Sequence, residues 1–198
     1  MKALLIIDIQ NDFVEGGSLA VAGGKEIVAL VNELQKDYEL VVATQDWHPK
    51  DHGSFAANHE GQEPGAVIDL HGLSQVLWPV HCVQGSFGAE FVSELDMSQV
   101  EKIFHKGTDS QIDSYSGFFD NGHRKDTGLG QYLKEKGVHA VDIVGLATDY
   151  CVKFSALDAA QLGFETTVIS AASRGVNLQA GDVEAAYEMM RAQGINIK

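Results

Sequence analysis

Cys151 is the residue in this sequence best suited to covalent chemistry, because a cysteine thiolate attacks the carbonyl carbon of amides and esters. It stands shortly after an apolar run, where a helix is predicted to begin. A thiol in the first turn of a helix lies at the positive end of the helix dipole, which favours the thiolate. Thr148 and Asp149 could each cap that helix. Cys151 is therefore our candidate nucleophile, although a buried structural role is the commoner fate of an intracellular cysteine.

Asp8 and Lys106 supply the two charges that would turn a thiol into a hydrolytic site. Asp8 lies near the end of the apolar run at 3–9, and Lys106 directly follows the run at 100–105. A lysine ammonium close to a thiol lowers the thiol pKa, and a carboxylate can take the thiol proton and later activate water. If the fold brings both residues to Cys151, the three together predict hydrolysis of an amide through a thioester.

A second group of side chains has the composition of a metal site. Asp46 and His48 stand two positions apart at a predicted strand end, so their side chains point to the same side. The following loop can return His81 as a third ligand. Two imidazoles and one carboxylate suit zinc, iron or manganese and leave coordination positions open for water or substrate. Further candidate ligands in the same histidine-rich stretch are His52 and His59.

Short apolar runs rich in β-branched residues predict the strands of a buried parallel sheet. The runs are 3–9, 40–44, 100–105, 140–146 and 166–170, with a weaker sixth at 194–197. Helical periodicity separates them at 27–34, at 149–162 with Gly163 at the C-cap, and at 183–190 with Asp182 at the N-cap. This alternation predicts a three-layer α/β/α fold with a mainly parallel, Rossmann-like central sheet of five to six strands.

The carboxyl ends of parallel strands meet at one edge of a sheet, which is where open α/β folds bind their ligands. Four predicted strand ends deliver the groups described above: Asp8, the pair Asp46 and His48, Lys106, and Cys151. Residues 47–90 are rich in Gly, Pro and His and too long for an ordinary connection, so we interpret them as an irregular metal-binding or lid segment. Because no linker or repeat divides the chain, residues 1–198 are predicted to form a single domain.

Composition limits the partners and the location. A formal charge of −14 disfavours nucleic acid and anionic membranes, because their phosphates would be repelled. No apolar stretch approaches the length of a membrane span, and the N-terminus lacks the pattern of a signal peptide. The two cysteines are therefore expected to be reduced and the protein cytoplasmic, with Cys82 a small buried apolar residue. Formation of a homo-oligomer is left open.

Five motifs give the chain a resemblance to a known family. They are LLIIDIQNDFVEGGSLAV at 4–21, ATQDWHPKDHGSFAANH at 43–59, LWPVHCVQGSFGAEF at 77–91, HKGTDSQIDSYSGF at 105–118 and VGLATDYCVKFSALDA at 144–159. In this order and extent the chain resembles the isochorismatase-like cysteine hydrolases, and among these the bacterial nicotinamidases, or pyrazinamidases. The resemblance implies hydrolysis of nicotinamide to nicotinate and ammonia in NAD salvage, with pyrazinamide as a second substrate.

The resemblance also implies roles for individual residues. It implies a catalytic triad of Asp8, Lys106 and Cys151, and an oxyanion hole formed by the backbone N–H groups of Ala147 and Cys151 after a cis Leu146–Ala147 peptide. It implies one divalent metal that orients the pyridine ring, zinc in the first place, held by Asp46, His48 and His81. His52 matches a ligand of some members only. The residues that match the family's substrate pocket are Phe13, Trp78, Tyr115 and Tyr150.

Two other functions are compatible with the sequence. The chain could hydrolyse a different small amide or a carbamoyl compound on the same fold, whereas isochorismate hydrolysis is disfavoured by the joint presence of the cysteine and the metal cluster. The chain could also be a catalytically silent metal-binding or scaffolding protein. The intact set of Asp8, Lys106 and Cys151 argues against a silent protein.

Overall fold

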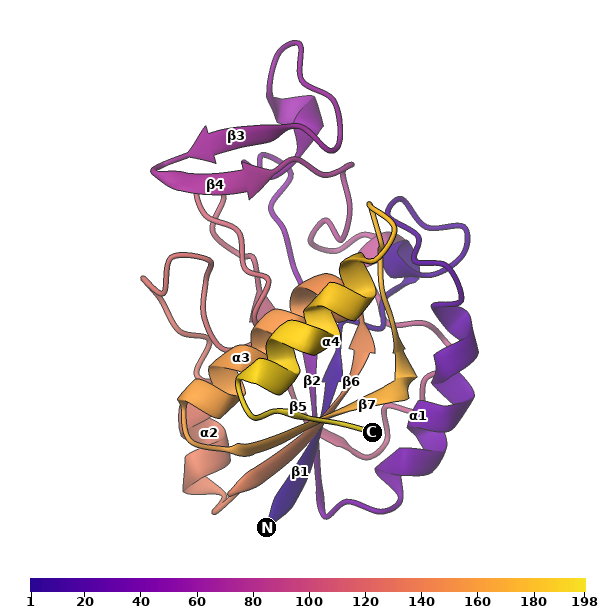
Figure 1. Cartoon of the computed structure of the whole chain (residues 1–198). Coiled ribbons are helices and arrows are strands. Elements are labelled where there is room, and N and C mark those ends of the chain that lie inside the picture. The colour runs from indigo at the N-terminus through magenta and orange to yellow at the C-terminus, as the bar shows by residue number, and fades with distance from the viewer.

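The computed structural model describes residues 1–198 and is built around a six-stranded sheet in the order β5-β2-β1-β6-β7-β8 (Figure 1). Every neighbouring pair of strands in this sheet runs parallel. The strands are β1 (Lys2–Ile7), β2 (Leu40–Asp46), β5 (Val100–Lys106), β6 (Ala140–Leu146), β7 (Glu165–Arg174) and β8 (Asn196–Ile197). All six predicted strands are confirmed. β2 and β6 are buried at every position, which explains why their sequences are continuous apolar runs rather than alternating ones.

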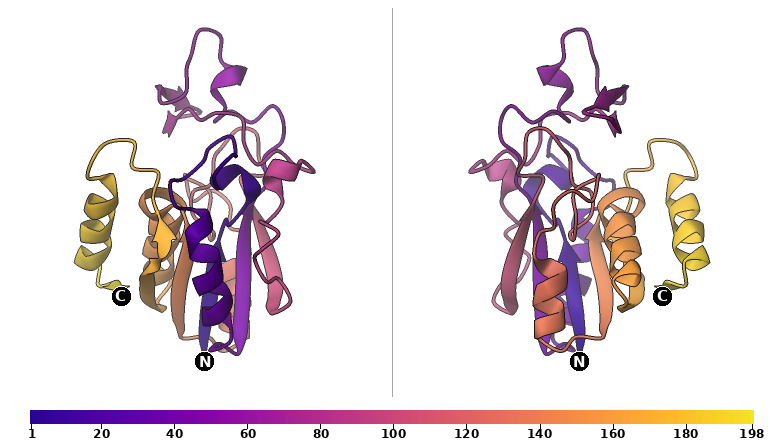
Figure 2. Two further views of the ribbon diagram at one scale, coloured as in Figure 1. Left: turned by 90° about the vertical axis from the view of Figure 1, so that its right-hand side faces the viewer. Right: turned by 90° about the vertical axis from the view of Figure 1, so that its left-hand side faces the viewer.

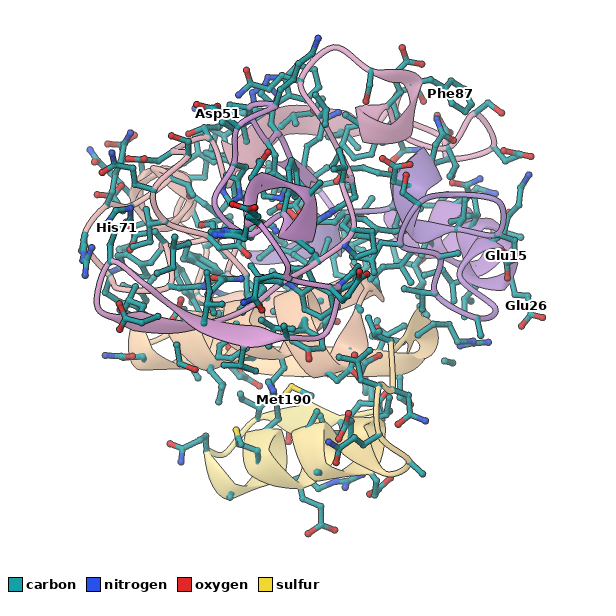
Figure 3. The ribbon with its side chains drawn as sticks, turned by 90° about the horizontal axis from the view of Figure 1, so that it is seen from above. Glu15, Glu26, Asp51, His71, Phe87 and Met190 are labelled. Carbon is teal, nitrogen blue, oxygen red and sulfur yellow. The ribbon has the colours of Figure 1, made fainter.

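Helices cover both faces of the sheet, as predicted for a three-layer α/β/α fold (Figure 2). They are α1 (Val28–Gln35), α2 (Leu129–Glu135), α3 (Lys153–Gln161) and α4 (Asp182–Ala192). Buried residues of α2, α3 and α4 join one core with the side chains of alternate strand positions such as Leu5 and Ile143. Buried residues of α1 join a second core with the intervening positions such as Leu4 and Val144. Met190, in the first of these cores, lies between α4 and the remainder of the protein (Figure 3).

Two helix starts differ from the predictions. α4 begins at Asp182 itself, and Gly181, with φ 99°, stands at its N-cap. The Asp182 carboxylate instead accepts a hydrogen bond from the Gln179 backbone N–H at 2.8 Å, so the predicted N-cap role is wrong. The predicted helix at 149–162 is divided, because residues 148–152 form a π-helical turn and α3 begins only after it. The C-cap of α3 is Leu162 rather than the predicted Gly163. Gly163 follows it with φ 91°, a left-handed conformation that favours glycine just after a helix.

Residues 47–90 lie over the carboxyl edge of the sheet, as expected of the irregular segment (Figure 1). They include one element that was not predicted, an antiparallel hairpin of β3 (Val67–Leu70) and β4 (Leu73–Val76). Among its strand residues only Leu70 and Gln75 are buried, so the hairpin leaves no apolar alternation in the sequence. Asp51, His71 and Phe87, all from this segment, lie at widely separated positions when the carboxyl edge is viewed from above (Figure 3).

No helix of the protein combines the length and the apolar character needed to cross a membrane. The two cysteines are both free and both buried, as expected of reduced thiols. Cys82 is fully buried within the core beneath α1, which confirms its interpretation as a small apolar residue.

Candidate active site

The sheet brings the three residues of the predicted triad into direct contact. The Lys106 Nζ lies 2.9 Å from the Asp8 Oδ2 and 3.5 Å from the Cys151 Sγ. A carboxylate oxygen of Asp8 and the Cys151 Sγ lie within 4.8 Å of each other. The three residues come from the carboxyl ends of β1 and β5 and from the turn after β6, so the strand-end argument predicted their meeting correctly.

Asp8 is a fully buried carboxylate whose position depends on an uncommon backbone conformation. Its φ is 47°, in the left-handed region, which aspartate tolerates better than most residues. The Thr44 hydroxyl donates a hydrogen bond to Asp8 Oδ1 at 2.7 Å. Burial raises the pKa of Asp8 to about 6, because the opposing effect of Lys106 does not outweigh it and Asp46 adds to it. Asp8 is therefore an ionised base at neutral pH that binds a proton readily.

Lys106 is the cation that joins the two groups of side chains. It is fully buried, and its Nζ contacts Asp8, donates a 2.5 Å hydrogen bond to Asp46 Oδ1 and donates another to the Ser114 carbonyl at 2.9 Å. Burial alone would lower the pKa of Lys106, but Asp46 and Asp8 outweigh burial and raise it well above its usual value. Lys106 is thus a permanent ammonium.

The protonation state of Cys151 differs from the expectation. Burial raises the pKa of the thiol well above its usual value, Lys106 lowers it, and Asp8 and Asp46 raise it again. The resting residue is therefore a thiol, not the thiolate that the helix start suggested. The geometry explains part of the difference, because Cys151 lies inside the π-helical turn of residues 148–152 rather than in the first turn of α3.

Neither Thr148 nor Asp149 caps the helix, contrary to the prediction. Ala147 stands at the N-cap of the π-helical turn, and no side chain caps it. The Asp149 carboxylate instead accepts hydrogen bonds from the backbone of the loop after β7. The Leu146–Ala147 peptide is cis, as the resemblance implied, and it leads directly into this turn.

Asp46, His48 and His81 form a buried cluster whose ligand atoms all lie within 4.8 Å of one another. The Nε2 atoms of His48 and His81 lie 3.6 Å and 3.9 Å from Asp46 Oδ2. Their Nδ1 atoms hydrogen-bond the carbonyls of Gly107 and Pro79, each at 2.8 Å. Such outer partners fix the tautomer that directs Nε2 toward a metal. Because the donor set matches a divalent cation, these residues fit the predicted metal.

Asp46 and His81 are in the protonation states that bind a metal, whereas burial of His48 is outweighed by Asp46, which raises the pKa of this imidazole, so a metal there would compete with a proton. Burial would raise the pKa of Asp46, but Lys106 and His48 outweigh burial and hold it well below its usual range, so Asp46 is ionised. Burial, with His48 adding to it, lowers the pKa of His81 to about 4, so this imidazole is neutral and keeps a free lone pair.

His52 lies beside this cluster, whereas His59 does not belong to it. The ligand atoms of His48, His52 and Asp113 also lie within 4.8 Å of one another. The buried His52 Nε2 has no hydrogen-bond partner, and its Nδ1 pairs with the Ser54 hydroxyl at 2.7 Å. Since His48 has only Nε2 free, the two groups of side chains meet at this one atom. The His59 Nε2 is bound to the Gly53 carbonyl at 2.7 Å.

A largely apolar pocket opens onto the Cys151 thiol. All four predicted pocket residues line it, and Trp78 and Tyr150 meet edge to face with ring centroids 4.9 Å apart. The Tyr115 hydroxyl accepts a hydrogen bond from Trp78 Nε1 at 3.2 Å. Asp46, His81 and Ala147 complete the wall near the thiol. The pocket thus joins an aromatic enclosure to the thiol and the metal cluster, as recognition of a small planar ring requires.

The sequence was compared with models of known protein families. The model of the Isochorismatase domain matches residues 2–197. The chain belongs to the isochorismatase family. Its six-stranded parallel sheet and helical layers are those of the family fold, as the resemblance implied. Within the family, the nicotinamidase of Escherichia coli is 47% identical over 200 residues, which cover 99% of this chain and 93% of the relative.

Solved structures of isochorismatase-family enzymes superpose closely on this chain. A nicotinamidase/pyrazinamidase of Acinetobacter baumanii has a TM-score of 0.96 at 47% identity, covering 99% of this chain and 94% of its own. The yeast nicotinamidase bound to the inhibitor nicotinaldehyde has a TM-score of 0.95 at 34% identity, covering 100% and 99%. The pyrazinamidase of Pyrococcus horikoshii in complex with zinc has a TM-score of 0.81 at 38% identity, covering 100% and 98%.

Three pocket residues of this isochorismatase-family chain were missed by sequence reasoning. Leu19 and Val176 are apolar wall residues on two separate loops, and Asp113 is a buried carboxylate in the loop after β5. Leu19 and Asp113 both lie within the quoted motifs, which is the only signal that could have drawn attention to them. Val176 lies outside every motif and is not distinguishable from an ordinary apolar loop residue.

Proposed function

We propose that this protein is a nicotinamidase, which hydrolyses nicotinamide to nicotinate and ammonia and accepts pyrazinamide as a second substrate. One observation carries the proposal: the lining of a single aromatic pocket includes the Cys151 thiol together with Asp46 and His81. A pyridine-3-carboxamide suits this lining, because its amide carbon can meet the thiol while a metal held at Asp46 and His81 would supply a Lewis acid for its ring nitrogen. The names and the close superposition of the family members support the same function.

The geometry assigns the proton transfers to Asp8. As the Cys151 sulfur bonds to the amide carbon, its proton passes to the Asp8 carboxylate, which lies beside it. The negative charge on the amide oxygen is stabilised by the backbone N–H groups of Ala147 and Cys151, which we propose as the oxyanion hole. Asp8 then protonates the nitrogen, the C–N bond breaks and ammonia leaves. Water, deprotonated by Asp8, hydrolyses the thioester to nicotinate and restores the thiol.

Lys106 and the aromatic residues have supporting roles in this proposal. The Lys106 ammonium stabilises the sulfur while it carries negative charge, since Nζ lies 3.5 Å from Sγ. It also keeps Asp8 ionised between proton transfers. Phe13, Trp78, Tyr115 and Tyr150 hold the ring and exclude water from the thioester. Asp46, His48 and His81, with His52 as a further ligand, would hold a divalent metal, most simply zinc, which supplies a Lewis acid for the ring nitrogen.

The function is tested by incubating the purified protein with nicotinamide and measuring ammonia and nicotinate. Release of both in equal amounts is expected, and N-carbamoyl compounds and simple aliphatic amides serve as competing substrates. Turnover of a competing amide with nicotinamide left intact would assign the chain to the alternative group of small-amide hydrolases. A metal-loaded protein that releases ammonia from none of these compounds would be a silent member of the family.

Removal of the metal should weaken substrate binding more than it disturbs the fold. We expect prolonged chelation to raise the KM for nicotinamide by about tenfold or more, because the ring nitrogen loses its partner. The far-UV circular dichroism should stay unchanged, and elemental analysis should show loss of one ion per chain. His81→Ala should lose the ion permanently, while the matched variant His59→Ala should retain it. A chelated protein with an unaltered KM would show that the metal does not bind substrate.

Two broader properties belong to the same proposal. We propose that residues 1–198 act as one catalytic domain, which the family match over residues 2–197 supports. We also propose the cytoplasm as the location, which the two free buried cysteines support because reduced thiols persist there.

A further inference from the structure

The loop between β7 and α4 forms one wall of the substrate pocket, and a buried carboxylate holds its backbone by hydrogen bonds. Val176, in this loop, lines the pocket. Asp149 is only 3% exposed, and its two carboxylate oxygens accept hydrogen bonds from consecutive loop residues. Oδ1 accepts from the Val176 N–H at 2.9 Å, and Oδ2 accepts from the Asn177 N–H at 2.7 Å. Hydrogen bonds to a charged acceptor are about twice as strong as neutral ones.

The backbone of the loop is shaped to fit this carboxylate. Asn177, the second residue bonded to the carboxylate, has φ 54°, a left-handed conformation that asparagine tolerates better than most residues. Gly175 lies so close to the carboxylate that a Cβ there would come within 3.0 Å of Asp149 Oδ1 and 2.3 Å of Val183 Cγ2. A side chain at Gly175 would therefore force Val183 or the loop itself to shift. Close approach and paired hydrogen bonds together define the position of Val176.

Asp149 also belongs to the turn that presents the nucleophile. It lies in the π-helical turn of residues 148–152, two residues before Cys151. One carboxylate thereby joins two parts of the pocket wall: the turn with Cys151 and the loop with Val176. The mechanism described above gives Asp149 no contact with substrate, and no other side chain bonds the backbone N–H of Val176 or Asn177.

We propose that Asp149 is a positioning residue that holds Val176 against the bound ring and so fixes the width of the pocket. The inference rests on the proposed nicotinamidase function for its substrate, and on the structure alone for the fastening of the loop. Without the carboxylate, the loop is free to move away, the ring loses one apolar wall, and substrate binds less tightly. The chemical step is affected less, because the lost hydrogen bonds belong to the loop after β7, and Asp8 and Lys106 lie on other elements.

The kinetic test compares Asp149→Ala, Asp149→Asn and Val176→Ala with the unaltered protein. Asp149→Ala should raise the KM for nicotinamide on the order of tenfold and change kcat by less than about threefold. Asp149→Asn keeps one acceptor oxygen, so its KM should lie between that of the unaltered protein and that of Asp149→Ala. Val176→Ala should raise KM by about fivefold, and the double variant should be no worse than Asp149→Ala, since both changes remove the same wall. A matched control is Asp182→Asn, whose carboxylate bonds the Gln179 N–H of the same loop outside the pocket.

A measurement without substrate separates this inference from the proposed function. Hydrogen–deuterium exchange should be faster over residues 175–178 in Asp149→Ala than in the unaltered protein and in Asp182→Asn. Unchanged exchange there would overturn the fastening of the loop, whatever the enzyme hydrolyses. A variant with normal KM and strongly reduced kcat would show instead that Asp149 serves the nucleophile turn. Additive effects in the double variant would show that Asp149 does not act through Val176. Failure of the unaltered protein to hydrolyse nicotinamide would refute the substrate and leave the exchange result standing.

Discussion

Cys151→Ala should abolish ammonia release from nicotinamide, with kcat lower by a factor on the order of 10⁴ or more. The pocket offers no second thiol, aliphatic hydroxyl or amine, because its other polar lining residues are the two carboxylates Asp46 and Asp113, His81 and two tyrosines. Alanine removes only the sulfur and leaves the aromatic wall and the metal cluster in place. Nicotinamide should therefore still bind, which calorimetry or quenching of tryptophan fluorescence can measure.

Cys82→Ala is the matched control for this variant, since both cysteines are free and buried. The Cys82 sulfur faces the Gly88 carbonyl at 3.9 Å, and Cys82 does not line the pocket, so turnover should be retained. Turnover by Cys151→Ala would place the nucleophile elsewhere. Loss of nicotinamide binding in Cys151→Ala would show that the thiol contributes to binding rather than to chemistry alone.

Lys106→Met should lose both activity and stability. The variant leaves Asp8 and Asp46 buried next to each other without the ammonium that neutralises them. Breaking a buried ion pair by removing one partner typically lowers the free energy of unfolding by about 3–5 kcal/mol. Turnover should fall in parallel, because nothing then stabilises the developing thiolate. Denaturant unfolding at neutral pH and ammonia release measure the two effects separately.

The stability deficit of Lys106→Met should depend on pH. The pKa of Asp8 is about 6 with Lys106 present, above its unfolded-state value, and loss of the cation raises it further. A carboxyl group with a raised folded-state pKa destabilises the fold at high pH, and the penalty disappears as the pH falls and the group binds a proton. The deficit should thus shrink between pH 7 and pH 5. Lys102→Met, on the exposed part of the same strand, should lower stability by no more than about 1 kcal/mol at either pH.

The strands and the triad were predictable because their signals are local. β1, β2 and β6 are short runs of mostly buried apolar residues, and β5 is an edge strand with several exposed ones. The residue at or just past the end of such a strand must lie at the carboxyl edge. That reasoning places Asp8, Lys106 and Cys151 together without any knowledge of loops. The pair Asp46 and His48 follows from strand geometry in the same way, whereas the return of His81 depended on an irregular segment and was a weaker inference.

The predictions that were wrong or missing concern properties set by the spatial surroundings of a residue rather than by its neighbours in sequence. The sequence places Cys151 at a helix start, but burial and two nearby carboxylates set its pKa, and both come from distant parts of the chain. Thr148 and Asp149 are residue types that often cap helices, yet the Asp149 carboxylate accepts a hydrogen bond from the Val176 backbone N–H instead. The β3–β4 hairpin escaped notice because most of its side chains face solvent.

The strand order affects how the sheet can form while the chain is being synthesised. β1 is synthesised before the other five strands of the sheet but lies in its middle, between β2 and β6. It can pair with β2 early in synthesis, while its other edge stays open until β6 has been made. Cys151, the proposed nucleophile, lies in the turn after β6, so it is the last member of the proposed triad to be synthesised. A nascent chain therefore holds no reactive thiol beside Asp8 and Lys106, and a truncated one exposes an apolar strand edge that invites aggregation.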